Sequence, residues 1–200
     1  MSKTIEFCFD LISPASYLAY TQVDAIAQEA EAEIIWKPVL VGAIHKATGN
    51  TAPITVPAKA KYLADDLLRY SDVYGVAFEM NPHFPFSSLT LMRMVTALLQ
   101  DDPEGFRFFL DTVFESIWVF GADLSDPEAL KTIVEAAGFK PAKLLARAEE
   151  QEIKDLLRAN TDYAVSRGAF GVPTFFVGDD MFFGQDRLEF VRDALRYSNS

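Results

Sequence analysis

The segment Ser13-Pro14-Ala15-Ser16 holds residue types that can do chemistry, at a point where a predicted strand passes into a helix. The first backbone N–H groups of a helix have no partner within it, and the helix dipole places partial positive charge there. An anion is therefore favoured at this point, and the pKa of a thiol held there is lowered. The Ser13 hydroxyl can donate to such a thiolate, but serine before proline is also an ordinary helix cap.

A second segment, Gly171-Val172-Pro173-Thr174, stands at the start of a predicted strand. Proline removes a donor from the sheet ladder, so its presence needs a reason. A cis Val172–Pro173 bond would leave the backbone of Val172 free to pair with an extended ligand by strand addition. The alternative is an ordinary trans proline at the first residue of a strand.

The third segment, Phe183-Gly184-Gln185-Asp186, directly precedes the last predicted helix. Backbone N–H groups at this helix start can bind a carboxylate, and the side chain of Asp186 can hold an amine. A simple capped helix start is again the alternative.

The other reactive residue types in the sequence give weaker evidence of a functional site. Cys8 is the only cysteine, which excludes an internal disulfide, and its apolar strand favours a buried small hydrophobe over a nucleophile. His45 and His83 have no second ligand at metal spacing, so we expect no metal site. The sequence has no glycine-rich phosphate loop and no Gly-x-Ser-x-Gly elbow.

The chain ends are predicted to build one sheet around these segments. Residues 4–10 read as a strand, the helix from Pro14 follows, and residues 33–40 read as a second strand. Such a βαβ unit is expected to be right-handed with parallel strands. At the other end we expect a strand at 172–177, its hairpin partner at 181–183 and a helix at 187–197.

The middle of the chain, residues 41–167, is predicted to be helical and inserted into that sheet. Asp102-Pro103 begins one helix by the cap-then-proline rule. Another begins either with a Ser125/Glu128 capping box or with Asp126 as cap, and Gly138 ends it. Further helices are expected at 57–74 and 87–99, with one or two more in 141–167. The predicted division is residues 1–40 plus 168–200 against residues 41–167.

Composition limits the possible functions. The 200 residues are 50% hydrophobic and 24% charged, which suits a folded domain with an insertion. The net charge of −11 argues against nucleic acid or an anionic membrane surface as partner. No apolar run approaches the roughly 18 residues that span a bilayer, and we see no signal peptide. We therefore expect a cytoplasmic protein.

The joint order of motifs resembles a known family over essentially the whole chain. The segments of this sequence that carry the resemblance are FDLISPASYLA, GNTAPITVPAK, NPHFPFSSLTLMR, WVFGADLSDP and GVPTFFVGDDMFFGQDRL. They resemble the 2-hydroxychromene-2-carboxylate isomerases and kappa-class glutathione transferases, in the DsbA-like branch of the thioredoxin superfamily. The resemblance implies an α/β thioredoxin-like fold with a large all-helical insertion. Redox members carry Cys-x-x-Cys where this chain has Ser13-Pro14-Ala15-Ser16, so no disulfide can form there.

By this resemblance the cofactor is glutathione and Ser13 is the serine that activates its thiol. Lys59 would meet the glycyl carboxylate, the backbone of Val172 would pair with the cysteinyl backbone, and the last helix start would receive the γ-glutamyl end. The implied glutathione contacts are Ser13, Asn50, Lys59, Val172, Pro173, Phe183, Gly184, Gln185 and Asp186. The match also favours a cis Val172–Pro173 bond.

Substrate contacts are chosen by residue type alone. Phe84, Trp118 and Phe120 can supply aromatic walls. Lys37, His45 or Arg93 can meet a substrate carboxylate.

The activity implied is glutathione-dependent cis–trans isomerisation of 2-hydroxychromene-2-carboxylate to trans-o-hydroxybenzylidenepyruvate, a step of naphthalene catabolism. The partners are then a small aromatic 2-oxo or 2-hydroxy acid, glutathione and a second copy of the chain in a homodimer. Two alternatives remain: a kappa-like transferase that releases a stable glutathione conjugate, and a DsbA-like binding module without catalysis.

Overall fold

A computed structural model describes residues 3–197, so the predicted boundaries at residues 1 and 200 lie outside it. Its four-stranded sheet has the order β2-β1-β3-β4. Strand β1 runs parallel to β2 and antiparallel to β3, and β3 pairs antiparallel with β4. The strands are β1 (Lys3–Phe9), β2 (Ala32–Pro38), β3 (Thr174–Val177) and β4 (Asp180–Phe183). Both chain ends therefore build one sheet, as the sequence predicts.

Helix α1 (Pro14–Ala30) connects β1 to β2 in the predicted βαβ unit. Strand β2 ends at Pro38, two residues before the predicted end. The chain then turns away, because Leu40 N–H donates to Thr161 Oγ1 and a helix begins at the next residue. Strand β3 likewise starts at Thr174, two residues later than predicted and directly after the cis Val172–Pro173 bond.

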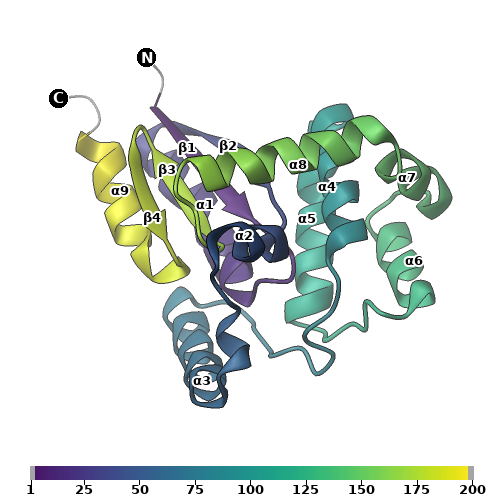
Figure 1. The fold of residues 1–200 in the computed structure, drawn as a ribbon, viewed down its shortest axis with the longest axis horizontal. Coiled ribbons are helices and arrows are strands. Elements are labelled where there is room, and N and C mark those ends of the chain that lie inside the picture. The colour runs from purple at the N-terminus through teal and green to yellow at the C-terminus, as the bar shows by residue number, and fades with distance from the viewer. Residues whose placement is uncertain (1–2, 198–200) are drawn as a thin grey trace.

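The two faces of the sheet are covered by different helices (Figure 1). Ile5, Phe7 and Phe9 point to the face that α1 and α9 (Leu188–Tyr197) cover. Cys8 and Phe176 point to the opposite face, under α8 (Gln151–Ser166). The alternation follows from the two-residue period of a strand, and both sets are apolar because both faces are covered.

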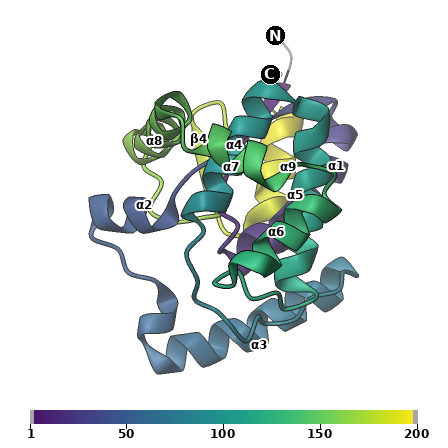
Figure 2. The same cartoon turned by 90° about the vertical axis from the view of Figure 1, so that its right-hand side faces the viewer.

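The helical middle leaves the sheet after β2 and returns to it along α8, which crosses the sheet in Figure 1. Figures 1 and 2 both place α3 below the sheet, and Figure 1 places α4–α7 beside it. The helices are α2 (Val41–Thr48), the short η1 (Pro53–Thr55), α3 (Pro57–Tyr74), α4 (Leu89–Asp101), α5 (Pro103–Trp118), α6 (Pro127–Ala136) and α7 (Pro141–Ala148).

Local cap signals explain several of these boundaries. Asp102 accepts from Gly105 N–H at the start of α5, as predicted. At the start of α6 the cap is Asp126, which accepts from Glu128 N–H, and not Ser125. Ser125 instead donates to Asp123. The last helix follows a short turn, η2 (Gln185–Arg187), and so begins one residue later than predicted.

One hydrophobic cluster joins the sheet to the inserted helices. The rings of Phe9 and Phe114 lie 6.4 Å apart, and Trp36 of β2 meets Phe106 of α5 at 5.7 Å. The insertion is therefore packed on the sheet through aromatic contacts. Within residues 3–197, no helix is both long enough and apolar enough to cross a membrane.

Candidate active site

The strand register brings the three predicted segments to one edge of the sheet. Thr174 pairs with Cys8 near the end of β1 and with Phe183 at the end of β4. The chain before β3 therefore lies beside the β1–α1 loop on one side and beside Phe183 on the other. Gly184 N–H donates to the Pro173 carbonyl at 2.9 Å and closes this arrangement.

Ser13 both caps α1 and has a hydroxyl proton to give. Its Oγ accepts from Ser16 N–H at 3.1 Å, while its own hydroxyl reaches the Val172 carbonyl at 3.4 Å. The latter distance is long for an O–H···O bond, so that proton is weakly held. Ser13 can therefore cap the helix and also donate to a thiolate, the two roles that the sequence left as alternatives. Its oxygen accepts the capping hydrogen bond while its hydrogen donates.

The Val172–Pro173 bond is cis, which confirms the prediction from the sequence. A second cis bond, Phe84–Pro85, was not predicted. Val172 is 8% exposed and Ser13 is half-buried, so both border on solvent at this edge.

Asn50 reaches the same edge from the loop after α2. Its amide donates to the Phe170 carbonyl at 2.8 Å, and the Phe170 and Phe183 rings lie 4.6 Å apart. Gly171 permits this packing, because a Cβ there would stand 2.8 Å from the Phe183 ring. Phe170 is 39% exposed and Phe183 40%, so together they form an open aromatic surface next to Val172. Sequence reasoning missed Phe170, although it directly precedes the Gly-Val-Pro segment.

Helix α3 supports the turn that follows β4. The Tyr74 hydroxyl donates to the Gln185 carbonyl at 2.5 Å, and burial raises the pKa of Tyr74. Asp186 forms an ion pair with Arg187. No local pattern in the sequence distinguishes Tyr74 from its neighbours, since its partner lies 111 residues away.

Lys59 is exposed in the first turn of α3. The structure shows no hydrogen bond or ion pair from Lys59 to Ser13, Val172 or the turn after β4, so its role stays a prediction.

The loop between β1 and α1 is held by the inserted helices. Leu11 N–H points at Met92 Sδ of α4 at 3.4 Å, and Trp118 of α5 donates to the Leu11 carbonyl at 3.0 Å. Trp118 is fully buried, so the expectation that it forms an open substrate wall is wrong: its ring belongs to the core and its N–H supports the Ser13 loop.

The remaining aromatic candidates stand outside the core. Phe84 is partly buried and contacts Trp118 with ring centroids 5.8 Å apart, and Phe120 is 75% exposed. Either can still border a substrate.

Two of the three predicted carboxylate-binding residues already have partners. Lys37 lies over the Tyr163 ring at 4.8 Å, on the α8 side of the sheet. Arg93 pairs with Glu149 at 2.7 Å. His45 lies on α2, and its partial burial lowers the pKa of its imidazole.

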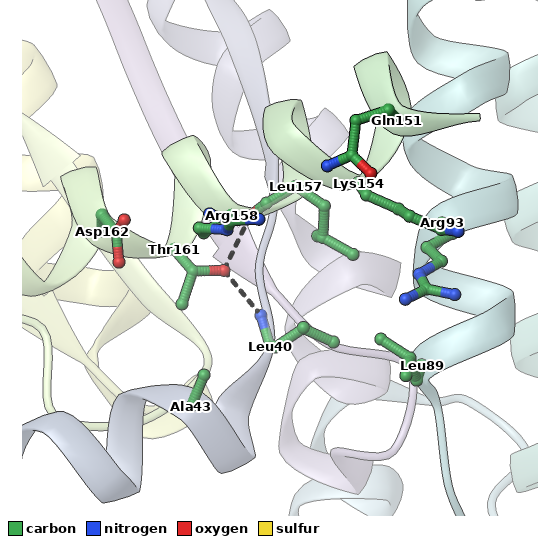
Figure 3. Close-up of a pocket in the computed structure, with 10 residues that line it drawn as sticks. All are labelled: Leu40, Ala43, Leu89, Arg93, Gln151, Lys154, Leu157, Arg158, Thr161 and Asp162. Carbon is green, nitrogen blue, oxygen red and sulfur yellow. Dashed lines mark hydrogen bonds between the residues drawn. The ribbon is translucent and has the colours of Figure 1, made fainter. Parts of the chain in front are cut away.

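A cavity of about 300 Å³ lies between α2, α4 and α8, and Figure 3 shows Arg93 and Lys154 together at one end of it. Its lining includes none of Ser13, Val172 or Pro173. Its cations are balanced by acids of the same chain: Glu149 bridges Arg93 and Lys154, and Arg158 pairs with Asp155. This cavity is therefore separate from the Ser13 edge and offers an anion little uncompensated charge.

Cys8 does not contribute a reactive thiol. It is fully buried on the α8 side of the sheet, and burial raises its pKa to about 12. Across residues 3–197, no group of three or more histidine, cysteine or acidic side chains is placed to hold a metal ion.

The fold and the Ser13 edge define a thioredoxin-type protein with a helical insertion. A family model described as a DSBA-like thioredoxin domain matches residues 4–196, and the chain belongs to that family. Within it, the chain is 32% identical to a 2-hydroxychromene-2-carboxylate isomerase of Sphingobium xenophagum, over 98% of this chain and 99% of the relative. It is 27% identical to glutathione S-transferase kappa 1 of Homo sapiens, over 98% of this chain and 92% of the relative.

Solved structures agree with this assignment. A 2-hydroxychromene-2-carboxylate isomerase superposes with a TM-score of 0.83 at 26% identity, covering 96% of this chain and 94% of the other. A thioredoxin-like oxidoreductase from Silicibacter pomeroyi superposes with a TM-score of 0.61 at 14% identity, covering 98% and 86%. The latter likeness concerns the fold alone.

Proposed function

We propose that the protein is a glutathione-dependent isomerase acting on 2-hydroxychromene-2-carboxylate or a closely related aromatic acid. The observation that carries the proposal is the Ser13 hydroxyl, which caps α1 with its oxygen and holds its proton loosely toward the Val172 carbonyl. Identity to an isomerase over nearly the full length of both chains supports it.

The described residues fit glutathione. The start of α1 favours a thiolate, and the Ser13 proton can turn from Val172 to that sulfur. Val172 stands before the first paired residue of β3, so its backbone suits an extended peptide. The turn at Gly184–Asp186 places the Asp186 carboxylate, paired with Arg187, and the backbone N–H groups of Gln185 and Asp186 where the γ-glutamyl end would lie.

When bound, glutathione supplies a thiolate that adds to a conjugated carbon, so that the former double bond can rotate before the thiol leaves. Ser13 stabilises the sulfur as thiolate at the start and end of this sequence. Asn50 and Phe170 hold the loop before Pro173, and Tyr74 holds the turn after β4. The segments proposed to bind glutathione are therefore preorganised.

A kappa-like glutathione transferase is the second candidate, because several relatives are kappa-class transferases at 24–27% identity. It would use the same thiolate and release a stable conjugate.

A glutathione-dependent absorbance assay on the chromene substrate, with free thiol counted before and after, separates the candidates. The isomerase converts substrate and leaves total thiol unchanged. The transferase consumes one thiol per turnover on an electrophile. Absence of glutathione binding by calorimetry would contradict both and leave the non-catalytic module.

A further inference from the structure

Asp10 is a fully buried acid beside the candidate site. It is 1% exposed, and it directly follows β1, three residues before Ser13. A buried carboxylate is costly unless hydrogen bonds satisfy it. The buried Asp10 carboxylate therefore needs hydrogen-bond donors close to it.

Three segments meet at this one carboxylate, and two of them donate backbone hydrogen bonds to it. Oδ1 accepts from Ile12 N–H at 3.2 Å, in the loop that leads to Ser13. Oδ2 accepts from Val41 N–H at 2.9 Å, the first N–H of α2. The Ser88 side chain, at the start of α4, faces the same carboxylate and lowers its pKa.

These donors oppose the cost of burial. Burial raises the pKa of Asp10, whereas the Ser88 side chain and the backbone N–H groups of Val41 and Ile12 lower it. The positive end of the α2 dipole lies at Val41 and also favours the carboxylate.

The loop that Asp10 anchors carries Ser13. Ser13 N–H donates to the Asp10 carbonyl at 3.0 Å, and Leu11 is fixed by Met92 and Trp118. The Asp10 side chain ties this loop to α2 and α4, two helices of the insertion. A shift of the loop moves the Ser13 hydroxyl relative to Val172.

We propose that Asp10 is a positioning residue, whose carboxylate holds the Leu11–Ser13 loop against the starts of α2 and α4 and so sets the place of the Ser13 hydroxyl at the thiol site. The proposal rests on the proposed function, in which Ser13 serves glutathione.

Asp10→Asn is the sharpest variant. An amide keeps the shape but has one acceptor oxygen, so its NH₂ group must face a backbone N–H of Ile12 or Val41. We expect kcat to fall between about ten- and a hundredfold, because small misplacements of a reacting group cost that much. Ser88→Ala removes the hydroxyl that faces Asp10 and leaves both backbone donors, so it should have a smaller effect, which Ser88→Thr should reverse.

The pKa of the bound glutathione thiol separates positioning from a through-space effect of charge. Removal of a nearby negative charge would by itself lower the pKa of that thiol. Displacement of Ser13 would raise it, because the thiolate loses a donor. We expect the thiolate absorbance of the bound cofactor to titrate at higher pH in Asp10→Asn.

Val134→Ala is the control for general destabilisation, since Val134 is fully buried on α6. It should lower the midpoint of denaturation without moving kcat or the thiol pKa. Equal kcat and thiol pKa in Asp10→Asn and wild type would overturn the proposal, as would losses that Val134→Ala reproduces. If Asp10→Asn does not fold, a Ser88→Ala protein with unchanged kcat and thiol pKa overturns it.

Hydrogen exchange without ligand keeps this test independent of the proposed function. Asp10→Asn should speed exchange at the Ile12 and Val41 amides, whereas Val134→Ala should not. If wild type binds no glutathione, the proposed function fails and exchange alone decides whether Asp10 holds the loop. Unchanged exchange at both amides contradicts the proposal.

Discussion

Ser13 and Ser16 share one helix start but differ in their hydrogen bonds. Ser13 Oγ is bonded to Ser16 N–H and to the Val172 carbonyl, whereas Ser16 Oγ is buried without a hydrogen-bond partner among the described residues. A buried hydroxyl without a partner contributes no hydrogen bond to stability. The two serines therefore provide a matched pair of substitutions.

Ser13→Ala should lower the glutathione-dependent rate about ten- to a hundredfold. Hydrogen bonds to charged groups contribute about 1.5–3 kcal/mol, and each 1.36 kcal/mol is about tenfold in rate. The thiolate absorbance of bound glutathione at neutral pH should fall with the rate. Ser16→Ala should retain both activity and the midpoint of unfolding. The reverse result, with Ser16 essential and Ser13 dispensable, would mean that the activating serine is misassigned.

We expect the protein to have no disulfide-exchange activity, because its only cysteine, Cys8, is buried. Only the thiolate attacks a disulfide, and burial holds the pKa of Cys8 near 12, so almost no thiolate exists at neutral pH. The insulin turbidity assay should show the uncatalysed rate, and Cys8→Ser should not change it. Catalysed turbidity that disappears in Cys8→Ser would refute this reading.

At the level of elements, α3 contributes to the site through one hydroxyl. Tyr74 donates to the Gln185 carbonyl, in the turn proposed to receive the γ-glutamyl end. Tyr62 lies on the same helix and is 63% exposed. The helix thus supplies both a test position and its control.

Tyr74→Phe should raise the KM for glutathione about two- to tenfold with little change in kcat. The loss of one neutral hydrogen bond costs about 0.5–1.5 kcal/mol, and here it loosens the turn and not the reacting atoms. Tyr62→Phe should leave the KM unchanged. A kcat effect in Tyr74→Phe larger than its KM effect would place the turn closer to the chemistry than we propose.

For the whole molecule, we expect a homodimer, as the family resemblance implies. Several large apolar side chains remain exposed on one chain, among them Tyr62, Val73, Phe108, Phe120, Phe190 and Tyr197. Stable homodimers often bury more than about 2,000 Å² in total. We expect exposed apolar side chains such as these to be buried in that interface. Light scattering at micromolar concentration should give twice the 22.3 kDa of one chain, and a mass of one chain would contradict the expectation.

Local rules predicted the elements that carry the site. Ser13 before Pro14, Asp102 before Pro103 and Asp126 before Pro127 each mark a helix start, because caps act within three residues of themselves. The period of apolar residues predicted the strands, and thereby the sheet built from both chain ends. The order of motifs predicted the cis bond at Pro173, which short-range rules alone disfavour.

The tertiary structure decided which side chains support that site. Asp10 meets Val41, Trp118 meets Leu11, and Tyr74 meets Gln185, across 31 to 111 residues of sequence. No local pattern encodes such pairs, because each depends on how the insertion packs against the sheet. Trp118 shows the limit most clearly: its residue type suits a substrate wall, but packing buries it, and its N–H instead fixes the loop before Ser13.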